Sequence, residues 1–91
     1  MWKYKLWRLR SKIDKIDDKV LFLLYKRFLI IKRIGQLKKK NGMKIKDKER
    51  EREILKNLRD HAKKFGLNEK FVNSVFDKII KEARKKEYKD G

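Results

Sequence analysis

The sequence has no cysteine and no proline, only one histidine, and four glycines among its 91 residues. Without cysteine the chain cannot form a disulfide, and a single histidine with no thiol argues against a tetrahedral zinc site. No apolar run approaches the roughly 20 residues that a membrane-spanning helix needs, and no signal-peptide pattern opens the chain. We therefore expect a cytoplasmic protein with no membrane partner and no bound metal.

A chain of this length forms one domain at most, and we expect a single domain over residues 1–91. So short a chain buries only a modest fraction of its surface by itself. Because disulfides are excluded and the composition argues against zinc, the remaining source of further burial is a second subunit.

Positive charge is in large excess, with 30 Lys and Arg against 13 Asp and Glu and a formal net charge of +17. Such an excess attracts anions, whether nucleic acid, an acidic membrane surface or a small polyanionic metabolite. A lysine-rich proteome would give the same balance by coating helices with Lys and Glu. Net charge alone does not decide between these explanations.

Three segments of the chain show helical periodicity. In the first, apolar residues recur in alternating steps of three and four with one gap at position 27, which is typical of a coiled-coil seam. Asn41-Gly42 and Gly66 suit helix ends, and Asp47 and Asn68 are candidate N-caps. We therefore expect an all-α chain with three helices, over about 4–40, 48–65 and 69–87.

The first helix would be near 50 Å long at about 1.5 Å per residue. The two shorter helices together contain about as many residues, and one copy of them covers so long a rod poorly. Pairing two rods along their seams buries both, so we expect a symmetric helical dimer. A three-helix monomer whose first helix breaks near Gly35 is the alternative.

Charged residues interrupt faces that should be apolar. Arg27 fills the gap in the first seam, and a buried guanidinium is costly unless it is paired or binds an anion. Lys38 follows on nearly the same face of the helix. Glu51 begins the apolar stripe of the second helix, and Glu87 ends that of the third. Each alone suits a solvated or ion-paired side chain, but together they indicate a polar pocket for an anion that also carries hydroxyl groups.

Arg10 lies about 25 Å along the helix from Arg27 and about 100° around it. One rod does not easily bring both to one small ligand, whereas an antiparallel pair of rods brings Arg10 of one chain toward Arg27 of the other. A surface arginine on a basic helix is the competing interpretation. We interpret His61 as a structural or surface residue.

Five segments, in order, match a known pattern. They are residues 9–17 with 23–27, Ile34-Gly35-Gln36-Leu37-Lys38, Ile45-Lys46-Asp47-Lys48-Glu49-Arg50-Glu51, Gly66-Leu67-Asn68, and Phe76-Asp77-Lys78-Ile79-Ile80. They resemble the small all-helical chorismate mutases, and the resemblance covers residues 6–87. It implies an intertwined antiparallel homodimer with two active sites. The enzyme would rearrange chorismate to prephenate, on the route to phenylalanine and tyrosine, without a cofactor.

The resemblance also implies how the two substrate carboxylates are held. Arg27, together with Arg10 from the partner subunit, would bind them, bidentately where geometry permits. Arg50 would support this carboxylate cluster.

The remaining implied roles concern the ether oxygen and the ring hydroxyl. Lys38 would lie at the ether oxygen, where negative charge grows as the C–O bond breaks. Glu51, with the backbone of Asp47, would orient the ring hydroxyl. Two positions depart from the family's common pattern, because Ala83 replaces a serine that often binds a carboxylate and Glu87 replaces a glutamine that often donates to the ether oxygen. An ionised Glu87 would repel the developing charge, so we expect activity to fall as pH rises through its pKa.

Three other interpretations stay open. Isochorismate-pyruvate lyases share the architecture, although intact Asp47, Arg50 and Glu51 favour the mutase. A basic helical nucleic-acid binder explains the net charge but not Arg27 on the seam, and predicts binding that weakens steeply with salt. A structural dimerisation module predicts that Arg27→Leu is tolerated or stabilising.

Overall fold

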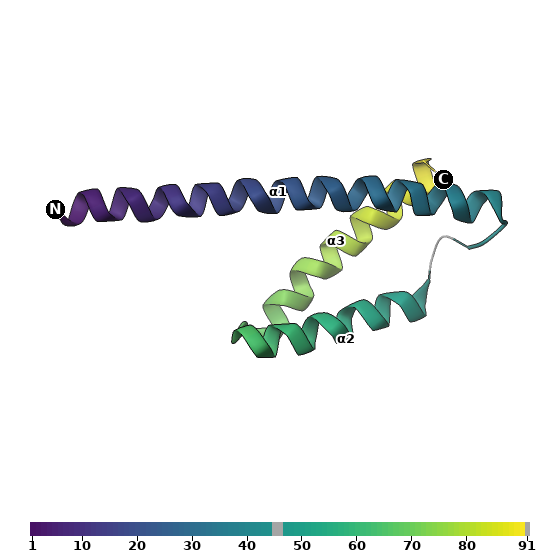
Figure 1. Cartoon of the computed structure of the whole chain (residues 1–91). Helices are drawn as coiled ribbons and strands as arrows, with labels where there is room; N and C mark the ends of the chain where they lie inside the picture. The colour runs from purple at the N-terminus through teal and green to yellow at the C-terminus, as the bar shows by residue number, and fades with distance from the viewer. Residues whose placement is uncertain (45–46, 91) are drawn as a thin grey trace. The chain divides into compact units, whose positions relative to one another are not determined.

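The computed structural model describes residues 1–44 and 47–90, with side chains described as far as residue 86. It contains three helices, α1 (Trp2–Lys40), α2 (Lys48–Phe65) and α3 (Glu69–Asp90) (Figure 1). No strand occurs in these described ranges. The all-α class with a long first helix is therefore confirmed. In the part of the chain that the structure describes, no helix has the length and apolar character needed to cross a membrane.

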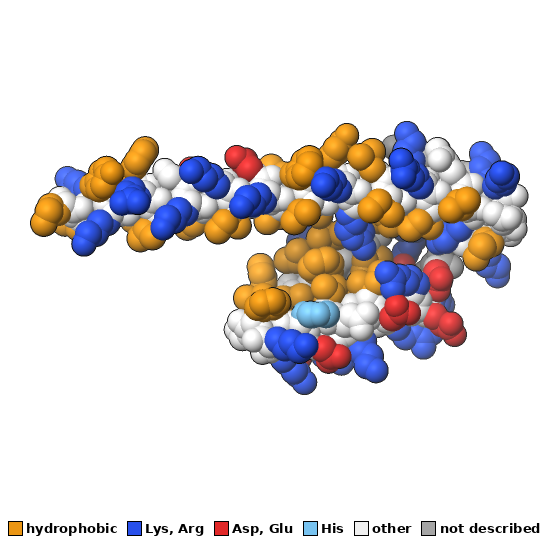
Figure 2. Space-filling view, in the orientation of Figure 1, with side chains coloured by type: hydrophobic (Ala, Val, Ile, Leu, Met, Phe, Trp, Pro, Cys, Tyr) orange, Lys and Arg blue, Asp and Glu red, His pale blue; other side chains and the backbone are white. Residues whose placement is uncertain are grey.

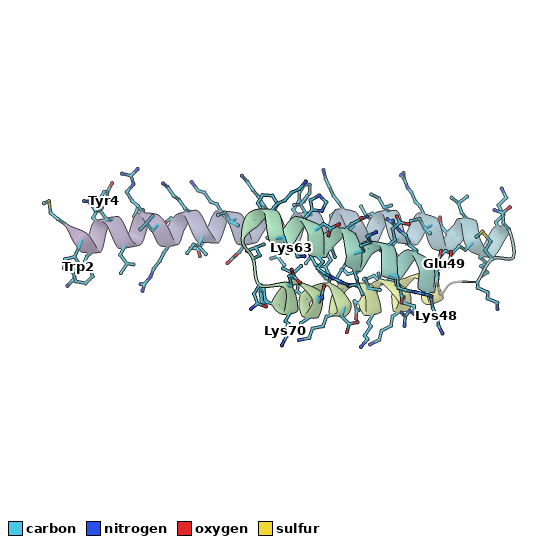
Figure 3. All side chains as sticks on the ribbon, turned by 90° about the horizontal axis from the view of Figure 1, so that it is seen from below. Trp2, Tyr4, Lys48, Glu49, Lys63 and Lys70 are labelled. Atoms are coloured by element: carbon cyan, nitrogen blue, oxygen red, sulfur yellow. The ribbon has the colours of Figure 1, made fainter. Side chains whose placement is uncertain are left out.

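Helix α1 runs without interruption through 39 residues, Gly35 included, so the alternative with a broken first helix is wrong. Hydrophobic side chains alternate with Lys and Arg along its whole length (Figure 2). The seam residues Leu9, Ile13 and Ile16 are 56–57% exposed. Trp2 and Tyr4, in its first turn, project to different sides of the helix (Figure 3). The apolar seam that the sequence predicts is therefore present, and it lies open in the single chain.

Two glycines end helices in the same way. Gly42 and Gly66 have φ of 65° and 67°, a left-handed conformation that glycine adopts without a Cβ penalty. At the first, the N–H of Met43 donates to the carbonyl of Lys38 at 2.8 Å; at the second, the N–H of Leu67 donates to the carbonyl of Ala62 at 2.9 Å. Both are Schellman motifs, in which the residue after the glycine satisfies a carbonyl of the last turn.

The starts of α2 and α3 are capped as expected. The carboxylate of Asp47 accepts a hydrogen bond from the N–H of Arg50, and the side-chain oxygen of Asn68 accepts one from the N–H of Phe71, each at 3.0 Å. Each bond satisfies a helix N–H that would otherwise have no partner within the helix. Side-chain caps therefore set where both helices begin.

The chain divides into two compact units, Met1–Ile30 and Ile31–Gly91. In the second unit the chain reverses after α2, and α2 and α3 pack side by side (Figures 1 and 3). Ala62 of α2 and Ile80 and Ala83 of α3 are the buried hydrophobic residues, while no large side chain in the described part is fully buried. The described core is therefore small and lies in this second unit.

Candidate functional site

The eight residues expected in the site fall in both units. Arg10 and Arg27 lie in Met1–Ile30, and the others lie in Ile31–Gly91. Arg10 is exposed and Arg27 is half-buried. Because both are on the continuous helix α1, their spacing corresponds to about 25 Å along its axis. A single copy of α1 therefore does not bring both guanidinium groups to one small ligand.

A hollow lies between the end of α1, the two residues 43–44 that follow it, and the start of α2. Its lining consists of Lys38, Met43, Lys44, Asp47, Lys48 and Glu49. Two of the predicted residues, Lys38 and Asp47, are thus brought together. Lys38 is half-buried, whereas Lys39 and Lys40 beside it are exposed. Lys38 is therefore less exposed to solvent than the two lysines that follow it.

The hollow also contains charged residues that the sequence reasoning did not single out. Lys44, Lys48 and Glu49 belong to its lining, and the last two stand in the first turn of α2 (Figure 3). Three lysines face two carboxylates, and the N-terminus of α2 adds partial positive charge. The sequence feature that predicts them is the close alternation of basic and acidic residues around Asp47. The hollow is suited to an anion.

Asp47 and Arg50 are engaged in local contacts. One carboxylate oxygen of Asp47 is used as the N-cap of α2. The guanidinium of Arg50 donates to Glu53 at 2.5 Å, and both side chains are well exposed. The structure therefore places Arg50 in a surface ion pair one turn along its own helix. Its expected role beside a carboxylate cluster stays a prediction.

Glu51 lies on the face of α2 that packs against α3. Its side chain is 25% exposed and accepts a hydrogen bond from the Nη2 group of Arg84, whose side chain is 33% exposed. Ala83, next to Arg84, is buried. Glu51 is thus at the contact between α2 and α3, and Ala83 is enclosed beside the residue that pairs with it. Of the expected residues, Glu87 lies in α3 but its side chain is outside the described residues, so its role stays a prediction.

Sequence reasoning missed Arg84. The signal was present, because Phe76, Ile80 and Arg84 are spaced by four and therefore share one face of α3. An arginine in line with half-buried Phe76 and buried Ile80 must either reach solvent or find an acidic partner. Here the partner is Glu51, on the neighbouring helix.

His61 makes a local contact and does not join the site residues. Its Nδ1 lies 2.7 Å from the carbonyl oxygen of Asn57, one turn earlier in α2, and its side chain is exposed. Within the described ranges, no group of three or more His, Cys, Asp and Glu side chains is placed to hold a metal ion. His61 thus has the surface position that the sequence suggested.

The arrangement suits binding more than covalent chemistry. Cations line the hollow. Glu51, one helical turn along α2 from Asp47, is held by the guanidinium of Arg84 on α3. Cations bind carboxylates and stabilise negative charge that grows in a transition state, and a carboxylate accepts a hydroxyl hydrogen bond. Such a set can orient a flexible anion with hydroxyl groups and lower the barrier to a rearrangement within it.

Comparison with known proteins points to one family. Residues 9–88 match the family described as chorismate mutase type II. A chorismate mutase of Methanocaldococcus jannaschii is 34% identical over 86 residues, covering 92% of this chain and 87% of that protein.

Longer bifunctional proteins match as well. A bifunctional chorismate mutase/prephenate dehydratase of Buchnera aphidicola subsp. Schizaphis graminum is 37% identical over 81 residues, covering 89% of this chain and 21% of that protein. The corresponding Aquifex aeolicus protein is 39% identical over 72 residues, covering 79% of this chain and 18% of that protein. This chain thus spans about a fifth of the length of these bifunctional relatives.

Proposed function

We propose that this chain, which belongs to the chorismate mutase type II family, catalyses the intramolecular rearrangement of chorismate to prephenate. It is thus an isomerase of aromatic amino acid biosynthesis, which we place in the cytoplasm. The observation that carries the proposal is the family match over residues 9–88, because that range contains every candidate site residue.

The reaction suits the side chains at hand. A pericyclic rearrangement breaks a C–O bond and forms a C–C bond within one molecule, so it needs no nucleophile, general base, metal or cofactor. The enzyme must fold a flexible dianion into its reactive shape and stabilise the separating charge. Fixed cations, rather than titrating groups, supply both effects.

We assign the cations to the substrate's negative groups. Arg10 and Arg27 bind the two carboxylates, with Arg50 supporting them, and guanidinium groups match a carboxylate's planar geometry. Lys38 lies at the ether oxygen, where negative charge develops. Its half-buried position in the hollow supports this assignment, because an ammonium acts more strongly when partly shielded from water.

The other contacts concern the hydroxyl and the departing oxygen. Glu51, with the backbone of Asp47, orients the ring hydroxyl. Glu87 in its protonated form donates to the ether oxygen. Ala83 lines this part of the site, where many relatives have a serine, so the arginines carry more of the carboxylate binding.

The proposed active form is an intertwined antiparallel homodimer in which each site takes Arg10 from the partner subunit. The open seam of α1 supports it, since Leu9, Ile13 and Ile16 are more than half exposed in the single chain. Burying such a side chain contributes about 1.5–3 kcal/mol. Antiparallel pairing along the seam also brings Arg10 of one subunit toward Arg27 of the other, which one copy of α1 cannot do.

The test is the loss of chorismate, followed by ultraviolet absorbance, with wild type, Lys38→Ala and Lys39→Ala. Lys39→Ala is the matched control, because Lys39 is the exposed neighbour of Lys38 and its substitution removes the same charge. We expect rapid loss with wild type and Lys39→Ala, and a rate at least about 100-fold lower with Lys38→Ala. Absence of prephenate formation by wild type would refute the function, and pyruvate release would indicate a lyase instead.

A further inference from the structure

Arg84 forms an ion pair that differs from the exposed pairs of this chain. It joins α3 to Glu51 of α2 across 33 positions of sequence, and both side chains are at least two-thirds buried. The pair between Lys81 and Asp77 lies within α3, and more than half of each side chain is exposed. Exposed pairs of that kind contribute little to stability. The Glu51–Arg84 pair, which is largely buried and joins two helices, therefore needs a separate explanation.

Stability is a poor explanation for this pair. The Nε of Arg84 is buried and has no hydrogen-bond partner within the described ranges. Taking two charges out of water offsets much of their attraction, and apolar side chains of similar volume in place of such a pair often serve stability as well or better.

The pair does fix the orientation of Glu51. A free glutamate side chain samples many rotamers, and ordering it on ligand binding costs free energy. A charge-assisted hydrogen bond from a guanidinium on a second helix removes much of that freedom beforehand. The bond uses Oε1 of Glu51, and an ionised carboxylate has acceptor sites on both oxygens. Glu51 can therefore keep this partner and still accept a hydrogen bond from a ligand hydroxyl.

Glu51 also lies close to the candidate site. Its backbone N–H donates to the carbonyl of Asp47 at 3.0 Å, in the first turn of α2, and Asp47 lines the hollow with Lys38. Glu51 thus lies one helical turn from Asp47, which lines the proposed site of chemistry.

We propose that Arg84 is a positioning residue, which holds the Glu51 carboxylate ready to bind the substrate's ring hydroxyl and thereby sets the preference for a hydroxylated substrate. The inference rests on the proposed function. Sites built to bind a hydroxyl discriminate strongly against analogues that lack it, because their own polar groups are then left unpaired. Arg84 contributes to that discrimination by acting through Glu51, without touching the substrate.

A double-mutant cycle tests this, with wild type, Arg84→Met, Glu51→Gln and the double variant. Lys81→Met is the matched control, because it removes a cation from the exposed pair on the same helix. We expect Arg84→Met to lower kcat/KM about tenfold, mainly through a higher KM, since the hydroxyl contact is made in ground and transition states alike. Lys81→Met should stay within about twofold of wild type, and Arg84→Met should add less than about twofold to Glu51→Gln.

A second readout separates positioning from a structural role. The ratio of kcat/KM for chorismate to that for an analogue lacking the ring hydroxyl should fall in Arg84→Met and stay unchanged in Lys81→Met. Circular dichroism checks that each variant is folded, and Arg84→Lys, which keeps the charge but not the planar fork, replaces Arg84→Met if that variant does not fold. We expect Arg84→Lys to show about a threefold loss that disappears in the Glu51→Gln background.

Two results would overturn the inference while the proposed function stands: wild-type kinetics in the Arg84 variant, or losses from Arg84 and Glu51 that multiply in the double variant. A wild type with no mutase activity would instead refute the function itself, and this inference with it. The activity of wild type therefore tells the two failures apart.

Discussion

Lys38, in the last turn of α1, and Asp47, the N-cap of α2, line the same hollow. The Schellman motif at Gly42 ends α1 just after Lys38, and the side-chain cap begins α2 just after Asp47. The motifs that end α1 and begin α2 thus also place the Lys38 ammonium and the Asp47 carboxylate in the lining of one hollow. Local folding signals and the candidate site coincide at this point of the chain.

Removing the two N-caps should separate stability from activity. Asp47→Ala and Asn68→Ala each delete one acceptor for a helix N–H, so each should lower the free energy of unfolding by about 0.5–2 kcal/mol, measured in urea. Only Asp47→Ala should also lower chorismate turnover, because Asp47 lines the hollow with Lys38. Asn68 caps α3, beyond the far end of α2. Equal activity loss in both variants would mean that turnover simply follows stability, and Asp47→Asn, which keeps a capping oxygen, should restore the stability.

The features that could be predicted from the sequence are those set by neighbours along the chain. Caps at Asp47 and Asn68 and the helix end at Gly66 depend on residues within one turn, and all three occur as expected. The family assignment, which rested on segments in order along one chain, is confirmed by the match over residues 9–88.

Features that depend on how helices meet could not be predicted in the same way. The Glu51–Arg84 pair forms because the packing of α2 on α3 fixes the rotation of both helices, and sequence spacing alone does not specify that rotation. The Arg50 ion pair is of the other kind, set by neighbours along the chain. Its partner Glu53 is three residues on, a spacing at which oppositely charged side chains of one helix meet, so the sequence alone predicts this contact.

A charge on the α1 seam should dissociate the proposed dimer. In Ile16→Lys the new ammonium would have to be buried without a partner, which costs several kcal/mol per chain. Sedimentation should show wild type at twice the mass of one chain and Ile16→Lys at the mass of one chain. The variant should also lose mutase activity, because Arg10 would no longer be supplied by a partner. Lysine at exposed Asn57 of α2, as a control, should change neither; an active Ile16→Lys monomer would contradict the shared site.

Glu87 should make the reaction sensitive to pH. Only its protonated form donates to the ether oxygen, so activity is present below the Glu87 pKa and is lost as pH rises through it. Glu87→Gln keeps a donor at every pH and should flatten kcat across that range, with the largest gain over wild type at the alkaline end. The measurement is a pair of pH–rate profiles at saturating chorismate. A wild-type profile that is already flat, or one unchanged by the substitution, would exclude Glu87 from the chemical step.

Mixing two inactive variants should restore activity if Arg10 acts across the dimer. Arg10→Ala and Arg27→Ala homodimers each lack one carboxylate-binding guanidinium at both sites, and each should be at least about 100-fold slower than wild type.

When the two are unfolded together and refolded at equal amounts, half of the dimers should be mixed. In each mixed dimer one site takes its Arg10 from the Arg27→Ala chain and its Arg27 from the Arg10→Ala chain, so that site is intact while the other lacks both. The mixture should therefore recover about a quarter of wild-type activity. Were Arg10 to serve the site of its own chain, every site would lack one arginine and no activity would return, so the yield of active sites reports directly which subunit supplies Arg10.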